Sequence, residues 1–199
     1  MPLTPPVSRE PLHHRAIDMR GFRRSDGLYD IEGRITDIRS YDFSPERGRT
    51  VKANTPLHDM WVRLIIDLEM QIHEVEAITD ASPFPECPSA APNLQVLKGV
   101  NLGKGWRKAI SEKLSGTDGC THLKELLNTI GSAAYQTMAP IRRARVAESA
   151  ESAKRVESKA AKARPPMLDS CFAMSTERTV ILRKWPAFYT GKTAAANKG

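Results

Sequence analysis

Residues 57–68 read Leu-His-Asp-Met-Trp-Val-Arg-Leu-Ile-Ile-Asp-Leu, and this stretch decides the fold. Its apolar side chains alternate, which is typical of a strand with one buried face. The apolar residues on that face are Met60, Val62, Leu64 and Ile66. Residues 72–78 alternate again after a short polar stretch, so the two segments predict an antiparallel hairpin. His58 stands at the start of the first strand, and His73 is interpreted as a cross-strand packing residue in the second.

An amphipathic helix is predicted after the sequence Asp118-Gly119-Cys120-Thr121-His122. Apolar residues recur there at helical spacing, at Leu123, Leu126, Leu127, Ile130, Ala133 and Ala134. The helix should begin near Cys120, where the positive end of the helix dipole favours the thiolate that attacks electrophiles or binds metal. His122 would reach the same site only if the first turn is irregular. The alternative is a buried thiol that serves as a small apolar side chain.

Further elements can be placed around this hairpin and helix. Residues 28–38 predict a strand with a bulge at Gly33, and residues 41–54 an exposed loop. Residues 102–114 predict a helix, and Pro140 is expected to interrupt the helix that starts near Cys120. His13 and His14 are interpreted as surface residues.

The predicted fold class is α+β, with a small, mainly antiparallel sheet of three to five strands and helices packed on one side. The C-terminal residues 167–174 and 179–185 predict two strands that add to this sheet. The expected domain organisation is a disordered arm (1–12), an α+β core (13–140), a charged helical segment (141–164), C-terminal strands (165–190) and a disordered tail (191–199).

The composition narrows the range of partners and cellular compartments expected for this protein. The net charge of +7 would attract phosphates, on nucleic acid or on a small molecule. Aromatic residues make up only 6% of the 199 residues, which argues against a stacking platform for nucleic acid. The chain has no run of about eighteen apolar residues for a membrane span and no apolar signal core at its start. Its three separated cysteines fit a reducing cytoplasm better than a disulfide framework.

Motifs along most of the chain resemble a bacterial family of unknown function, family 2889. They run from His13-His14-Arg15 through the Gly119-Cys120-Thr121-His122 helix start to Ala134-Tyr135-Gln136-Thr137, with Lys184-Trp185-Pro186 near the end. The resemblance implies little chemistry. Members of that family often lie among genes of acyl-CoA and aromatic-compound catabolism, which suggests a substrate class rather than a mechanism.

A fainter resemblance is to the NifU-type iron–sulfur scaffold fold, in which a hairpin, a loop and a long helix each bring one ligand cysteine. His58, Cys87 and Cys120 stand where those ligands would lie. Because His58 stands where a cysteine is expected, the resemblance leaves two alternatives open, an iron–sulfur cluster and a mononuclear His/Cys/Cys metal site, for example with zinc.

Three functions follow as hypotheses. The first is a small-molecule enzyme that hydrolyses an acyl-CoA thioester, either with Cys120 as thiolate and His58 or His122 as base, or with these residues and Cys87 around a metal. The second is a metal-binding or iron–sulfur accessory protein that uses His58, Cys87 and Cys120. The third is a non-catalytic interaction module, with the charged helical segment as a partner-binding or homo-oligomerising arm.

Overall fold

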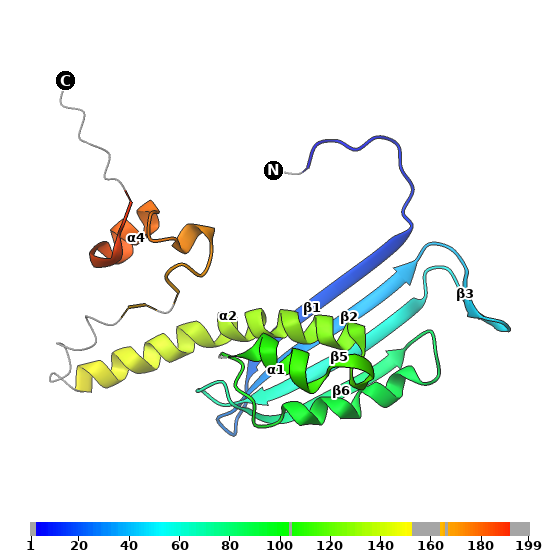
Figure 1. Ribbon diagram of the computed structural model, residues 1–199, viewed down its shortest axis with the longest axis horizontal. Coiled ribbons are helices and arrows are strands. Elements are labelled where there is room, and N and C mark those ends of the chain that lie inside the picture. The colour runs from blue at the N-terminus through cyan, green and yellow to red at the C-terminus, as the bar shows by residue number, and fades with distance from the viewer. Residues whose placement is uncertain (1–2, 104, 153–163, 166, 192–199) are drawn as a thin grey trace. The chain divides into compact units, whose positions relative to one another are not determined.

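The computed structural model describes residues 3–103, 105–152, 164–165 and 167–191. Four antiparallel strands form the main sheet in the order β1-β2-β5-β6. They are β1 (His13–Arg23), β2 (Tyr29–Arg39), β5 (Pro56–Ile66) and β6 (Ile72–Ala81). Helix α2 (Thr121–Ser152) runs along the sheet, as Figure 1 shows. The predicted α+β class and the β5–β6 hairpin are therefore confirmed.

Short helical segments connect the sheet to α2. They are η1 (Cys87–Ala90), η2 (Pro92–Leu97), α1 (Trp106–Lys113) and η3 (Gly116–Asp118). Leu94, Leu97 and Ile110 from these segments are buried in one hydrophobic core with the inner face of the sheet and the apolar stripe of α2. The predicted helix over residues 102–114 is shorter than expected, because Gly105 adopts a left-handed conformation just before Trp106.

The inner face of the sheet is built from rows of side chains that lie directly opposite one another. Ile17, Ile35 and Met60 form one such row across β1, β2 and β5. Paired residues of antiparallel strands project to the same face. This register makes the inner face apolar along most of its length and gives α2 a surface to cover.

Gly33 belongs to the inner face and does not form the predicted bulge. It pairs in regular register with Met19 on one side and Val62 on the other. A Cβ atom at Gly33 would lie 3.0 Å from both Leu126 Cδ1 and Met19 Sδ, so the missing side chain lets α2 approach the sheet. The irregularity falls instead in the pairing of β2 with β5 after Asp37, where Leu57 of β5 is the extra residue.

Helices α1 and α2 meet at Trp106. Its indole Nε1 donates a hydrogen bond to the carbonyl of Leu127 at 2.9 Å, in a buried setting. A Cβ atom on Gly131 would lie only 2.6 Å from Trp106 Cδ1. Glycine at this helical position therefore allows close packing at a cost in helix propensity.

Replacing Gly131 with alanine is expected to destabilise the protein. The clash with the Trp106 ring costs about 1–3 kcal/mol, which exceeds the gain in helix propensity of at most about 1 kcal/mol. Denaturant unfolding followed by tryptophan fluorescence measures the difference. The exposed α2 residue Gln136, replaced with alanine, is the control and should change stability by less than about 0.5 kcal/mol. A Gly131→Ala protein more stable than the wild type would contradict this packing.

Two sequence interpretations in this region were wrong. Residues 41–54 contain a two-stranded hairpin, β3 (Phe43–Glu46) and β4 (Arg49–Val51), rather than loop alone. Pro140 does not interrupt α2, which continues to Ser152. Pro140 lies on an exposed side of the helix, where water can solvate the carbonyl that loses its hydrogen bond.

The C-terminal residues do not supply the predicted strands. The described part of this segment forms η4 (Phe172–Met174), α4 (Thr179–Lys184) and η5 (Pro186–Phe188). The β-branched run at residues 179–181 suggested a strand. In the structure, local hydrogen bonds such as the one from Trp185 N–H to the Ile181 carbonyl close a helical turn instead. Ile181 is buried in this turn. Cys171 just before η4 is exposed.

The chain divides into two compact units, residues 1–145 and 146–199. The predicted charged segment 141–164 is helical as far as Ser152, and its residues 153–163 lie outside the described residues. Most of the predicted tail 191–199 also lies outside them, as do the first two residues of the predicted arm 1–12. None of the helices in the described part of the chain combines the length and apolar character that a bilayer crossing requires.

Candidate functional site

One row of the inner sheet face is polar instead of apolar. Arg15 of β1, Asp37 of β2 and His58 of β5 lie directly opposite one another in the register. This row is two residues along each strand from the apolar row of Ile17 and Ile35. The pairing of β2 with β5 becomes irregular just beyond this row, between Asp37 and Ile38, and such irregularities often lie next to active sites.

Helix α2 begins beside this row and brings two further side chains to it. Cys120 precedes the helix, and its carbonyl accepts the first helical hydrogen bond from Lys124 N–H. Its Sγ lies 3.9 Å from His122 Nδ1. The His122 ring lies against the His58 ring, with 3.8 Å between centroids. The irregular start that would let His122 share a site with Cys120 is therefore present, because Cys120 lies outside the helix.

Asp37 is the centre of the site. It is buried, with 1% of its surface exposed. Arg15 donates two hydrogen bonds to it, from Nε to Oδ1 and from one terminal nitrogen to Oδ2, each 2.8 Å long. His13 Nε2 lies 2.8 Å from Oδ1, and His58 Nδ1 lies 2.9 Å from Oδ2. Arg15 also bonds Glu125 of α2, which ties the strand to the helix.

These contacts keep Asp37 ionised. Burial by itself would raise the pKa of its carboxyl, but the hydrogen bonds from Arg15 and His13 and the nearby positive charge lower the pKa well below its usual value. A carboxylate has no proton to give, so His58 Nδ1 must donate the hydrogen bond and Nε2 carries the free lone pair.

Both histidines favour the neutral form. Burial lowers the pKa of His58, and the neighbouring His122 lowers it further, against the opposing effect of Asp37. Burial and then the charge of Arg15 lower the pKa of His122, against the opposing effects of Asp37 and Glu125. Each imidazole is therefore available as a base near neutral pH.

These lowered pKa values predict acid-sensitive stability. Below the ordinary histidine pKa of about 6.5, the unfolded chain binds protons that the folded site rejects, so stability falls as the pH decreases towards the lowered folded values. The slope should reach at most about 1.4 kcal/mol per pH unit for each histidine. Denaturant unfolding between pH 7.5 and 5 should show a flatter slope for the double variant His58→Asn/His122→Asn. The Gln136→Ala control, which removes no titratable group, should keep the wild-type slope.

A cavity of about 390 Å³ opens on this cluster. It is lined by His13, Arg15, Asp37, Arg39, Tyr41, Leu57, His58 and His122. Bases, a buried carboxylate and cationic donors thus converge on one concave space, which is the arrangement expected of a binding or catalytic site.

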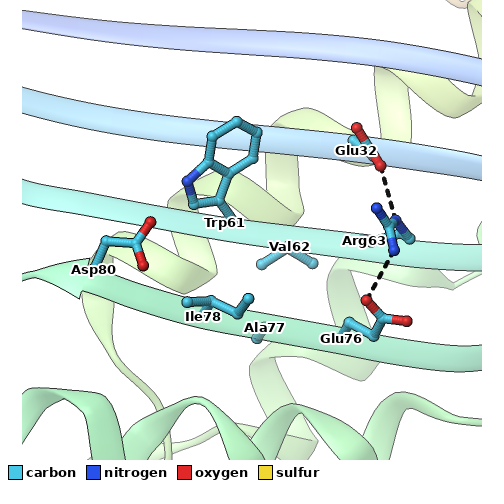
Figure 2. A pocket seen from close by; sticks show the side chains of 8 residues that line it. All are labelled: Glu32, Trp61, Val62, Arg63, Glu76, Ala77, Ile78 and Asp80. Carbon is cyan, nitrogen blue, oxygen red and sulfur yellow. Dashed lines mark hydrogen bonds and ion pairs between the residues drawn. The ribbon is translucent and has the colours of Figure 1, made fainter.

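A second cavity, of about 310 Å³, lies on the outer face of the sheet and lacks such chemistry (Figure 2). Arg63 lies there between Glu32 and Glu76, with hydrogen bonds of 2.8 Å and 2.9 Å, so its charge is already compensated. Trp61 and Ile78 supply the apolar part of its wall. This surface is a cross-strand ion-pair network, and the inner cavity is the candidate site.

The metal-ligand set His58, Cys87 and Cys120 is not brought together as the sequence suggested. Among the described residues, the possible ligands that lie within 4.8 Å of one another are Asp37, His58 and His122. Cys87 lies at the start of η1, after the end of β6, and takes no part in that group. Its proline-flanked bend follows β6, whereas the cluster is formed by the inner sheet face and α2.

The remaining group is a poor cation site as it stands. A 2-His-1-carboxylate set suits several divalent metals. Here, however, both oxygens of Asp37 accept hydrogen bonds from Arg15, and the guanidinium adds a positive charge beside the place a cation would occupy. The carboxylate is better described as an orienting group for the histidines than as a metal ligand.

Sequence reasoning missed Asp37, Arg15 and His13. Strict alternation from Tyr29 through Ile31, Gly33 and Ile35 puts Asp37 on the buried face, where an unpaired charge would be costly. Interpreting Gly33 as a bulge hid that signal. His13 was interpreted as a surface residue, and it is exposed, but its contact with Asp37 across the β1–β2 pairing was not foreseen.

Fold and site together define an α+β protein with a largely buried Asp–His–His cluster beside a cysteine at a helix start. A family model described as a protein of unknown function (DUF2889) matches residues 13–136, and the chain belongs to this family. The matched range contains every residue of the candidate site. No curated protein and no solved structure matches the chain significantly, and the resemblance to the NifU-type scaffold is not supported by these comparisons.

Proposed function

We propose that this protein is a cysteine-dependent hydrolase of activated acyl groups, with an acyl-CoA thioester as substrate. The observation that supports it is the line from Cys120 Sγ to His122 Nδ1 at 3.9 Å, and from His122 Nε2 to Asp37 Oδ2 at 3.8 Å. Thiol, imidazole and carboxylate stand in the order of a cysteine hydrolase triad. Distances of this length are usual before a substrate draws the groups together.

The chemistry follows from these positions. His122 Nδ1 takes the proton of the Cys120 thiol, and the thiolate attacks the thioester carbonyl carbon. The tetrahedral intermediate collapses, the C–S bond to the carrier breaks, and the leaving thiolate takes the proton from His122. The acyl group is then bound to Cys120.

The second half returns the enzyme to its starting state. His58 Nε2, whose lone pair is directed by the Nδ1–H bond to Asp37, removes a proton from water. The hydroxide attacks the acyl-cysteine, the free acid leaves, and the Cys120 sulfur takes back the proton from His58. Neutral histidines suit both halves, because each must accept a proton first.

Several features support a thioester over other acyl donors. Attack of a thiolate on a thioester costs little free energy, because one thioester is exchanged for another and one thiolate for another. The cavity of about 390 Å³ carries Arg15 and Arg39 on its wall, and the chain has a net charge of +7, which favours a phosphate-bearing carrier. The reducing cytoplasm, where this proposal places the protein, keeps the thiol free.

Turnover tests the proposal directly. Purified protein is incubated with acetyl-CoA, benzoyl-CoA and a longer aliphatic acyl-CoA, and released thiol is followed with a chromogenic reagent. Hydrolysis of at least one thioester above the buffer rate is expected. If all three survive while the protein carries one equivalent of metal, the enzyme proposal fails in favour of the next one.

A metal-binding accessory protein is the second candidate, and the Asp37–His58–His122 grouping is the observation that favours it. Binding would require Arg15 to release Asp37, because Arg15 donates to both oxygens of this carboxylate. Elemental analysis of protein purified without chelator distinguishes the two candidates. A visible absorption band would point to an iron–sulfur cluster. A protein with neither metal nor turnover would favour the interaction module, with a partner or second copy bound through residues 141–164.

A further inference from the structure

Arg39 lines the cavity, and among the described residues no carboxylate compensates its charge. It ends β2 and pairs with His13, so its side chain starts from the inner face of the sheet. The other arginine of the cavity, Arg15, is bonded to Asp37 and Glu125. Within the described part of the chain, Arg39 takes part in no ion pair. Its guanidinium therefore lies at the cavity wall with its full charge.

Aromatic side chains hold the Arg39 guanidinium in place. Its central carbon lies 3.8 Å from the centroid of the Phe43 ring and 5.6 Å from that of Tyr41. One terminal nitrogen donates to the Tyr41 hydroxyl at 3.1 Å. Stacking of this kind leaves the in-plane N–H donors free and restricts the side chain before any ligand binds. The hydroxyl of Tyr41 accepts from Arg39 and so still has its own proton to donate.

We propose that Arg39 and Tyr41 form an anion subsite of this cavity, which binds a phosphate or carboxylate group of the substrate. The guanidinium supplies a planar pair of N–H donors for two oxygens, and the Tyr41 hydroxyl supplies a third donor. Arg39, Tyr41 and the bases His58 and His122 line the same cavity, so a bound anion lies in one space with the two proposed bases. This inference rests on the proposed function, because it specifies that the acyl thioester substrate carries an anionic group.

The anion has two possible sources, which share the same oxyanion chemistry. It is either a phosphate of the carrier or a second carboxylate on the acyl group. A carrier phosphate would make coenzyme A the preferred thiol whatever the acyl group is. An acyl carboxylate would make dicarboxylic monothioesters, such as glutaryl thioesters, the preferred substrates whatever the carrier is.

Binding of two probes that need no catalysis tests the subsite. Free coenzyme A and glutarate are titrated calorimetrically into wild-type protein, into Arg39→Gln and into Arg23→Gln. The last variant removes the same charge from an exposed position of β1 outside the cavity. We expect at least one probe to bind wild type, with Kd raised about 10- to 100-fold in Arg39→Gln and unchanged in Arg23→Gln. The probe that binds identifies the source of the anion.

Two further variants separate a role in binding from one in folding. Arg39→Lys keeps the charge but loses the planar donor pair, and it should bind the probe with intermediate affinity. Tyr41→Phe removes one donor and should raise Kd by a smaller factor than Arg39→Gln. All four variants are checked for a wild-type thermal unfolding midpoint.

Several outcomes would overturn the inference. They are no binding of either probe at millimolar concentration, equal Kd values for wild type and Arg39→Gln, or equal losses in Arg39→Gln and Arg23→Gln. A Cys120→Ala protein should bind the probe as wild type does. Binding that depends on Arg39, in a protein that hydrolyses no thioester, would therefore keep the subsite and reject the hydrolase. Hydrolysis that proceeds unchanged in Arg39→Gln would keep the hydrolase and reject the subsite.

Discussion

Cys120→Ala protein is expected to lose thioester hydrolysis, with kcat reduced about 10⁴-fold or more. Removing the nucleophile of a covalent mechanism eliminates the acyl-enzyme pathway, and only binding and any direct attack of water remain. Stability should change little, because Cys120 is only partly buried at the helix start. Thiol release from the best acyl-CoA substrate, measured beside a denaturant unfolding curve, gives both quantities.

The chain offers matched controls for this substitution. Cys171 is exposed in the second unit, and Cys87 lies in η1, outside the Asp37–His58–His122 group. Alanine at either position should leave kcat within about twofold, since no step of the mechanism uses these thiols. Cys120→Ala with wild-type kcat would remove the covalent pathway and leave His58–Asp37 as a dyad that activates water. Mass spectrometry of wild type quenched during turnover should detect an acyl group on Cys120.

Asp37→Asn protein is expected to have kcat lowered about 10³- to 10⁴-fold, with KM changed much less. An amide donor facing His58 Nδ1 would favour the tautomer with the proton on Nε2, so the base would lose its free lone pair. The substitution also leaves Arg15 without its buried carboxylate. The loss of stability should be smaller than the cost of about 3–5 kcal/mol for a fully buried pair, because the Arg15 side chain is 32% exposed and water can solvate its charge. Steady-state kinetics at a temperature well below the unfolding transition separates the two effects.

Asp59→Asn is the matched control for that variant. Asp59 is also buried, at 7% exposure, and it accepts two hydrogen bonds from an arginine, Arg34. It does not line the cavity and has no histidine partner among the described residues. The control should therefore lose stability but keep its kcat. Equal losses of kcat in both variants would mean that Asp37 acts only through folding.

Local sequence patterns were enough to predict the central elements. β5 and β6 alternate with the period of a half-buried strand, and the stripe from Leu123 to Ala134 repeats with the period of a helix. Each pattern depends on residues that are close in the chain, and it indicates which face of the strand or helix is buried. Pattern reasoning failed where a long-range contact decides: Gly33 is required by the approach of Leu126, not by its own strand.

The candidate site shows the same division. Cys120, His122 and His58 could be singled out by residue type, because a thiol at a helix start and a histidine at a strand end are few in this chain. The residues that contact them could not be predicted in this way. Cys87 was as reasonable a choice as any, and only the fold shows that Asp37 takes the place beside His58.

The amino-acid sequence by itself determined the α+β class, the central hairpin, the amphipathic helix and the chemical types available to a site. Hydrophobic periodicity encodes these features within about ten residues of chain. The tertiary structure alone decided that Arg15, Asp37 and His58 stand in one row and that α2 starts above them. The physical reason is that strand register and helix docking are set by contacts between distant segments, which no local pattern records.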